Sequence, residues 1–252
     1  MENSDYPILI SIIIPTKNEG KYVGRTLEQY RDYMQRYGLE IIVSDANSTD
    51  DTALVVQAIR DTWGGNQVRL VQRPGKQNIA IGRNFGAAAA KGEILFHTDA
   101  DVFIPKKDAF FTAILATFRR PAVVAATTPI WVYPEERGWK DHLYHLLMNT
   151  LIRISFTVGV YLAKGECQLV RRSVFEEIQG YNETIVAGED CNLFYRLHKI
   201  GKIAYLYRLA VHHSPRRFRE YGYLRLTMVY VREGLSLLFR GKSWVEEWKQ
   251  VR

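Results

Sequence analysis

The sequence predicts an α/β protein with a doubly wound, mostly parallel sheet and helices on both of its faces. Short, continuous apolar runs are typical of strands that are buried on both faces, and here they alternate with longer segments of helical spacing. The 252 residues also suffice to bury a sizeable core, and chains of this length often form one α/β domain.

Strand and helix segments follow each other in order along the first half of the chain. The first apolar run covers residues 8–14, and Pro15 is expected to end that strand. The segment 20–35 then repeats apolar side chains at helical spacing. The same reasoning predicts strands at 39–44, 68–71, 93–96 and 123–127, and helices at 49–60, 77–90 and 106–118. This repeating β-α order favours a parallel sheet.

The second half of the chain is less regular, and its longest helical segment, 139–157, is unusually apolar. From residue 216 onward, Arg and Lys are mixed with aromatic and aliphatic residues. No linker is evident, so we expect one domain over residues 1–215 with a helical C-terminal extension at 216–252. The other expected elements are a short strand at 165–170, a short helix capped by Ser173 and ended by Gly180, and a helix at 189–200.

Charge and cysteine content limit the kinds of partner and compartment. The formal net charge of +7 favours anionic partners such as nucleotides, phosphates or a membrane surface, although a merely basic surface is an equal alternative. Nucleic acid is not expected as a partner. Cys167 and Cys191 form no Cys-x-x-Cys pair, which argues against a zinc site or disulfide scaffold. With no secretory signal and no 18-residue apolar stretch free of charge, we expect a cytoplasmic protein.

The most informative stretch is Asp99-Ala100-Asp101, directly after the strand at 93–96. Two carboxylates this close repel each other unless a cation lies between them. Ligands of open α/β sheets bind beyond the carboxyl ends of the strands, and Mg²⁺ or Mn²⁺ takes oxygen ligands from carboxylates and substrate phosphates. The stretch therefore predicts a metal–diphosphate site, with a solvated loop as the alternative.

Two other strand ends carry polar groups that point to the same edge of the sheet. Thr16, Asn18 and Glu19 follow the first strand, and Asp45 ends the second. Each of them alone fits ordinary turn chemistry. Their convergence on the edge that carries Asp99 favours a ligand site over separate turns.

Five ordered motifs, spread over roughly residues 8–215, resemble the family 2 glycosyltransferases, which are inverting enzymes that use nucleotide sugars. They are SIIIPTKNE at 11–19, IVSDANSTD at 42–50, GRNFGAAAAKGE at 82–93, DAD at 99–101, and GY at 180–181 followed by GED at 188–190. The resemblance implies a GT-A fold, a nucleotide-diphosphate sugar donor and Mg²⁺ or Mn²⁺ as cofactor.

The resemblance also implies roles for individual residues, and these are matched motif by motif. It gives Pro15, Thr16, Asn18 and Glu19 to the base and ribose pocket, Asp45 to the base, Arg83 to the nucleotide and diphosphate, Asp99 to ribose and metal, Asp101 to the metal, and Asp190 to the general base. Many relatives have Tyr where Lys17 stands, so the base is left undefined. A helix N-terminus at Asp190 is expected to lower the pKa of its carboxyl.

A final set of candidates lies after the apolar pair at 210–211. His212 and His213 point to opposite faces if they lie on a strand, and we favour His212 as a metal ligand. The Ser-x-Arg-Arg run at 214–217 is similar to a run in some family 2 subgroups, where Arg216 or Arg217 would bind the diphosphate. The alternatives are a polar strand end for the histidines and a solvated basic face for the arginines.

The expected activity is the transfer of one sugar to a glycan, lipid-linked or small-molecule hydroxyl, because the Gln-x-x-Arg-Trp motif of processive synthases is absent. A nucleotidyltransferase acting on a sugar phosphate and a non-catalytic nucleotide-sugar binding protein are the alternatives. The apolar segments at 139–157 and 221–248 suit a membrane interface, which would make the protein peripheral on the membrane. Core packing or a homodimer contact would explain the same segments.

Overall fold

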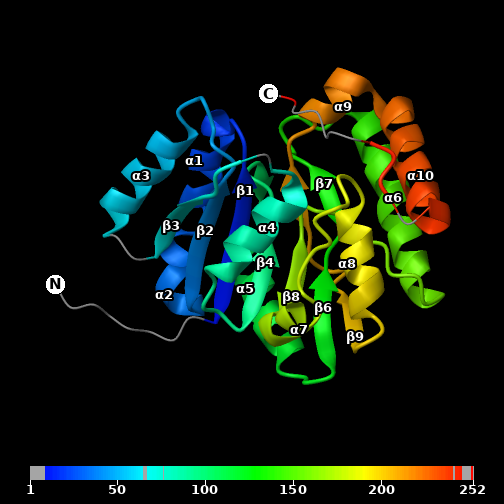
Figure 1. Ribbon diagram of the computed structural model, residues 1–252, viewed down its shortest axis with the longest axis horizontal. Coiled ribbons are helices and arrows are strands. Elements are labelled where there is room, and N and C mark those ends of the chain that lie inside the picture. Colours follow the sequence, from blue (N-terminus) through cyan, green and yellow to red (C-terminus); the bar gives the residue numbers. More distant parts are fainter. Residues whose placement is uncertain (1–8, 65–66, 76, 241, 246–250, 252) are drawn as a thin grey trace.

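The computed structural model describes residues 9–64, 67–75, 77–240, 242–245 and 251 (Figure 1). Its strands are β1 (Ile10–Thr16), β2 (Leu39–Asp45), β3 (Val68–Gln72), β4 (Ile94–His97), β5 (Val102–Phe103), β6 (Val123–Thr127), β7 (Ile130–Val132), β8 (Gln168–Arg171), β9 (Lys202–Tyr205) and β10 (Val211–His213). Its α-helices are α1 (Gly20–Glu28), α2 (Met34–Tyr37), α3 (Thr52–Trp63), α4 (Ile79–Ala88), α5 (Lys107–Phe118), α6 (Trp139–Thr157), α7 (Arg172–Glu177), α8 (Glu189–Leu197), α9 (Arg216–Tyr221) and α10 (Tyr223–Arg240).

The main sheet has seven strands in the order β3-β2-β1-β4-β8-β6-β9. All neighbouring strands run parallel except β8, which is antiparallel to both β4 and β6. The prediction of a mostly parallel sheet is therefore confirmed. The antiparallel β8 was not anticipated, because an apolar run does not reveal the direction of its strand.

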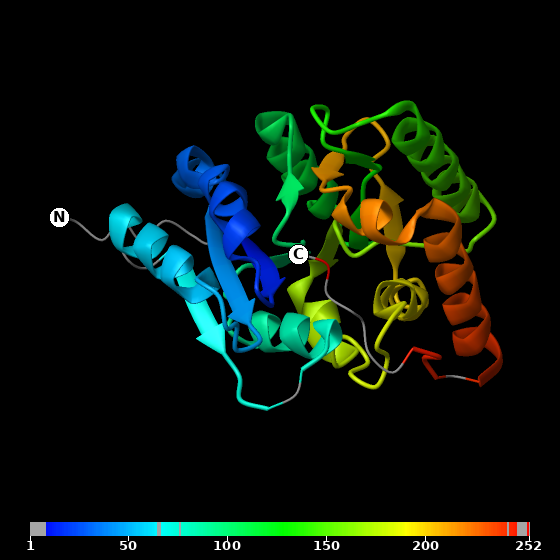
Figure 2. The same ribbon diagram turned by 90° about the horizontal axis from the view of Figure 1, so that it is seen from above.

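Helices cover both faces of the sheet, as Figure 2 shows from above. Alternate residues of β1 belong to different cores: Ile12 and Ile14 pack with residues of α1, α3 and α5, whereas Ile13 packs with residues of α4, α7 and α8. The alanine-rich helix α4 approaches the sheet closely. A Cβ added at Gly86 of α4 would lie 2.7 Å from Ile13 Cγ2, so no larger residue fits there.

Several element boundaries differ from the predictions. Ile8 lies outside the described residues, and β1 continues through Pro15 to Thr16. The Ile13 carbonyl accepts from the Thr98 N–H, so the backbone of Pro15, two residues on, also faces the β4 side. Pairing between β1 and β4 ends at Ile13, and the missing N–H of Pro15 therefore costs no hydrogen bond between the strands. The helix predicted at 20–35 is split into α1, a 3₁₀ turn at Arg31–Tyr33, and α2.

Ser173 had been expected to cap the short helix, but it does not. Instead α7 begins at Arg172, with Arg171 in the N-cap position, and the chain leaves the helix through Gln179 and Gly180, both in the left-handed conformation. A three-stranded sheet of β5, β10 and β7 was also missed, because strands of two or three residues are too short to show a periodic pattern.

The C-terminal helix α10 lies beside α6 at the edge of the molecule that is farthest from α3, as both views show (Figures 1 and 2). The rings of Tyr144 and Tyr223 join the two helices with centroids 4.7 Å apart. Part of the predicted extension, including Trp248, lies outside the described residues. Among the described helices, none combines the length and the apolar composition that crossing a bilayer requires.

Candidate active site

Acidic side chains gather at the edge of the main sheet where β1, β2 and β4 end. Besides the acids predicted there, the loop that precedes β8 supplies Glu166, because an antiparallel strand begins at the edge where its parallel neighbours end. Glu166 is close enough to Asp99, Asp101 and Asp190 to raise the pKa of each of these carboxyls. The sequence analysis missed Glu166, and the available signal was an acid directly before a predicted strand.

Asp45 is fully buried, and its carboxylate accepts hydrogen bonds only from protein groups. In-register strands place Thr16, Asp45 and Gln72 side by side. Thr16 Oγ1 donates to Oδ1 of Asp45 at 3.0 Å, and Gln72 Nε2 donates to Oδ2 at 3.0 Å. The backbone N–H and the hydroxyl of Ser48 donate to the same carboxylate. In the ligand-free protein Asp45 therefore holds the loop after β2, and its contact with a base stays a prediction.

The loops after β1 and β2 are tied to each other. Asn18 lies in the left-handed conformation, and its Oδ1 accepts from the Thr49 N–H at 2.7 Å. Lys17 Nζ donates to the Ala46 carbonyl at 2.7 Å. Lys17 thus binds the neighbouring loop.

Replacing Asp45 by alanine is expected to lower the free energy of unfolding by roughly 3 kcal/mol, because a buried donor without an acceptor costs about 1–3 kcal/mol. Urea denaturation measures this change, and Asp61→Ala is the control because Asp61 is exposed on α3. A fully stable Asp45→Ala variant with weakened nucleoside monophosphate binding would instead make Asp45 a base-contacting residue.

Arg83 of α4 is the centre of a buried charge network. Its guanidinium is fully buried and pairs with Glu189 Oε1 at 2.8 Å and with Asp99 Oδ1 at 3.0 Å. It also donates to the carbonyl of Gly165 at 3.0 Å, and a Cβ at Gly165 would lie 2.5 Å from Nη2. The structure therefore places Arg83 behind the acids, where it positions Asp99 and Glu189. Its predicted contact with the nucleotide stays a prediction.

Arg216, at the start of α9, joins the first loop to the acid pair. Both terminal nitrogens of its guanidinium donate to Glu19, at 2.7 and 2.8 Å, while Nε lies 3.1 Å from Asp101 Oδ2. The first residue of the predicted C-terminal extension thus belongs to the site. Arg217 does not take part in these contacts and interacts electrostatically with Tyr230.

The acids around Asp101 outnumber the cations that face them. Burial raises the pKa of Asp101 to about 7; the negative charges of Asp99, Glu19 and Glu166 add to this effect, and Arg216 opposes it. Burial also raises the pKa values of Asp99 and Glu19. Carboxylate oxygens with surplus negative charge are the donors that Mg²⁺ and Mn²⁺ prefer, so the residues present fit a divalent cation. Within the described part of the chain, however, no ready-made group of three or more metal ligands is formed.

The two histidines point to opposite faces of β10, as predicted, and His213 rather than the favoured His212 lies on the side of the acids. Buried His213 faces the acids, with Nδ1 3.4 Å from Glu166 Oε1, while His212 lines a separate cavity. The reason is the register of β10 between β5 and β7, which the sequence did not reveal. A metal-ligand role for either histidine stays a prediction, and this geometry favours His213 over His212.

Glu189 and Asp190 begin α8 and have different surroundings. Glu189 is buried against Arg83, whereas Asp190 is partly exposed and its Oδ1 accepts from the Cys191 N–H at 2.7 Å. The Cys191 N–H at the start of the helix lowers the pKa of Asp190, as expected, but burial outweighs it and leaves that pKa raised. A base with a raised pKa remains suited to proton removal near neutral pH.

Comparison with known proteins agrees with this geometry. The model of the family "Glycosyl transferase family 2" matches residues 11–179. The succinoglycan biosynthesis protein ExoA of Rhizobium meliloti is 24% identical over 193 residues, which cover 75% of this chain and 58% of the relative. The beta-monoglucosyldiacylglycerol synthase of Synechocystis is 24% identical over 246 residues, with 86% and 48% covered. The chain thus spans about half the length of these curated relatives.

The fold is also found in solved structures. The mannosyltransferase PcManGT from Pyrobaculum calidifontis, solved with GDP-Man and Mn²⁺, superimposes with a TM-score of 0.68 at 20% identity, over 91% of this chain and 66% of that chain. This likeness shows the GT-A fold that the sequence predicted. Because the family model covers more than half of the chain and the fold agrees, the protein belongs to glycosyl transferase family 2.

Proposed function

We propose that this protein transfers one sugar from a nucleotide-diphosphate sugar to an acceptor hydroxyl, with inversion at the anomeric carbon. The observation that carries the proposal is the convergence of Asp99, Asp101, Glu166 and Asp190 on one sheet edge within a family 2 fold. Acids that surround a diphosphate need a cation to offset their repulsion. Of the two acids that begin α8, Asp190 is partly exposed and Glu189 is buried, so Asp190 is the one that an acceptor can reach.

Asp99, Asp101 and His213 would hold Mg²⁺ or Mn²⁺ in this site. When bound, such a cation supplies Lewis-acid neutralisation of the charge on the leaving diphosphate. Arg216 already lies against Asp101, and its planar guanidinium matches phosphate oxygens. We infer that Arg216 binds the diphosphate and that Glu19 orients it through the bidentate pair described above.

The chemical step is a single displacement. The acceptor oxygen attacks the anomeric carbon from the side opposite to the diphosphate, and the bond between that carbon and the diphosphate oxygen breaks. The proton of the acceptor hydroxyl passes to the carboxylate of Asp190. A positioned base of this kind contributes roughly 10²–10⁴-fold to the rate. Arg83 fixes the positions of Asp99 and Glu189 beside the reacting groups.

For the acceptor, we propose a lipid-linked hydroxyl. One relative is named as the synthase of a glucosyl diacylglycerol, and several leucines of α6 are exposed on the surface of this protein. Glycan and small-molecule acceptors are the other classes that an acceptor screen would include.

The proposed metal role is tested by measuring nucleoside diphosphate affinity with Mn²⁺ and with EDTA. In the Asp101→Asn variant the enhancement by Mn²⁺ is expected to fall by about tenfold or more, because a contact to a full charge is worth about 1.5–3 kcal/mol. Asp61→Asn is the matched control, since it removes an exposed acid far from the site. Equal affinities of the wild type in Mn²⁺ and in EDTA would show that the metal assignment is wrong.

A further inference from the structure

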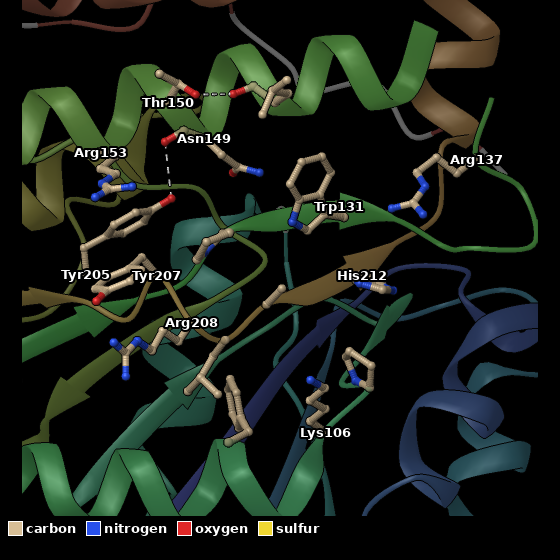
Figure 3. Close-up of a pocket in the computed structure, with 16 residues that line it drawn as sticks. Lys106, Trp131, Arg137, Asn149, Thr150, Arg153, Tyr205, Tyr207, Arg208 and His212 are labelled. Carbon is tan, nitrogen blue, oxygen red and sulfur yellow. Dashed lines mark hydrogen bonds between the residues drawn. The ribbon is translucent and has the colours of Figure 1, made fainter. Parts of the chain in front are cut away.

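A second site lies on the other side of β10 from the acids. It is a cavity of ≈ 530 Å³ between α6 and the segments that flank β9 and β10 (Figure 3). His212 lines this cavity while its neighbour His213 contacts Glu166, so the two sites are separated by one strand. The cavity is therefore distinct from the acidic site.

The cavity is strongly basic. Lys106, Arg137, Arg153 and Arg208 line it, together with tyrosine and tryptophan side chains, and no Asp or Glu is among the lining residues (Figure 3). None of these four cations pairs with a carboxylate within the part of the chain that the structure describes. Arg153 and Arg208 instead lie over the ring of Tyr207, at 5.2 and 5.6 Å from its centroid. A lining of this kind suits an anionic ligand.

The helix that borders the cavity exposes an apolar stripe. Its buried residues are polar, Asp141, His145, Asn149 and Ser155, and a partly buried apolar row lies beside them: Tyr144, Met148, Ile152 and Phe156. The exposed apolar stripe, which we call the α6 stripe, consists of Leu143, Leu147, Leu151, Ile154 and Val158. A soluble surface helix normally shows the opposite arrangement, so the α6 stripe is built to contact an apolar environment.

The cavity and the α6 stripe are continuous. Leu146, Thr150 and Arg153 line the cavity, and each directly precedes a residue of the stripe, which lies about 100° further around the helix. The adjacent helix α10 presents a second exposed row: Leu224, Met228, Val231 and Leu235. Trp139, at the start of α6, is 73% exposed. Cationic, aromatic and aliphatic side chains are thus carried by neighbouring elements, and α6 and α10 lie side by side at one edge of the molecule (Figures 1 and 2).

We propose that this edge docks on an anionic phospholipid bilayer, with a headgroup phosphate in the basic cavity and the α6 stripe at the boundary of the acyl chains. Interfacial helices combine an apolar face with nearby cations and aromatic residues in this way, and anionic lipids attract the cations. A second copy of the chain is a poorer occupant. A twofold interface built on this edge would bring the basic cavities of the two copies toward each other, and their like charges would repel.

The test is co-sedimentation of the full chain with vesicles of phosphatidylcholine, with and without phosphatidylglycerol. Binding is expected only to the anionic vesicles and should weaken as salt is added. Arg153→Gln and Arg208→Gln should each lower the partition coefficient roughly fivefold. Leu147→Ser and Leu151→Ser should each lower it roughly tenfold. Arg60→Gln and Leu54→Ser on α3 are the matched controls and should partition as the wild type does.

Equal binding to neutral and anionic vesicles, or no binding at all, would overturn the proposal. It would also be overturned if Leu147→Ser changed the molecular mass in solution but not the partition, because the α6 stripe would then bind a second copy. Partition is measured without donor or metal, so this result is independent of the sugar transfer proposed for the acidic site. Unchanged nucleoside diphosphate affinity in all four variants confirms that they remain folded.

Discussion

Replacing Arg83 by methionine is expected to lower the free energy of unfolding by about 3–5 kcal/mol, because removing one partner of a buried ion pair leaves an uncompensated charge. Arg83 is fully buried, and both acids that it holds come from other segments: Asp99 from the end of β4 and Glu189 from the start of α8. Methionine fills a similar volume but cannot donate to either carboxylate. The two acids then face each other without a cation.

The loss should grow as the pH rises. Burial and the charge of Asp190 already raise the pKa of Glu189 to about 8 in the wild type, although Arg83 opposes them. Without Arg83, the Glu189 carboxyl of the folded protein keeps its proton to a still higher pH than in the wild type. The variant therefore continues to lose stability as the pH rises above about 8, where the wild type has already released this proton.

Urea denaturation at pH 7 and pH 9 measures both effects, because the two proteins bind different numbers of protons only above the wild-type pKa of about 8. Arg60→Met is the control, because Arg60 pairs only with its exposed neighbour Asp61 among the described residues. Adding Glu189→Gln to Arg83→Met should restore part of the stability and reduce the dependence on pH. A single variant as stable as the wild type at both values would show that the buried network does not hold the site together.

The fold could be predicted largely from the sequence because its parallel strands are buried on both faces. Such strands are uninterrupted apolar runs, and β1, β2 and β6 were each located to within two residues. Elements defined by tertiary pairing were missed. The sequence of β8 resembles that of any short buried strand, and it contains no local signal for the antiparallel direction that the strand takes beside β4. The short strands β5, β7 and β10 exist only because they pair with one another.

The candidate site follows the same division. Acids at the ends of predicted strands, such as Asp99 and Asp101, were found because strand order alone brings them to one edge. Glu166 was missed because its place depends on the direction of β8. The pair between Glu19 and Arg216 joins residues 197 positions apart, and such a contact has no local signature. The alternation of side chains along a strand predicted that His212 and His213 point to opposite faces. It could not tell which of the two faces the acids, so the choice of His212 had no structural basis.

Replacing Asp190 by asparagine is expected to lower the rate of sugar transfer by roughly 10²–10⁴-fold, the contribution of a positioned general base. The change is conservative in structure. Oδ1 of Asp190 accepts from the Cys191 N–H, and an amide oxygen can accept the same hydrogen bond. Asparagine cannot take up the proton of the acceptor hydroxyl, so the chemical step alone should suffer.

Three measurements separate this role from the alternatives. Donor affinity in Mn²⁺ should match that of the wild type, since Asp190 does not hold the diphosphate in the proposed site. Glu189→Gln is the matched comparison on the same helix turn: it should lower stability through Arg83, whereas Asp190→Asn should not. Donor affinity that falls together with the rate would make Asp190 a donor-site acid, and retained activity would remove it from the mechanism. NMR of the product supplies the last check, because a single displacement must invert the anomeric carbon, and a retained configuration would exclude Asp190 as the base of such a step.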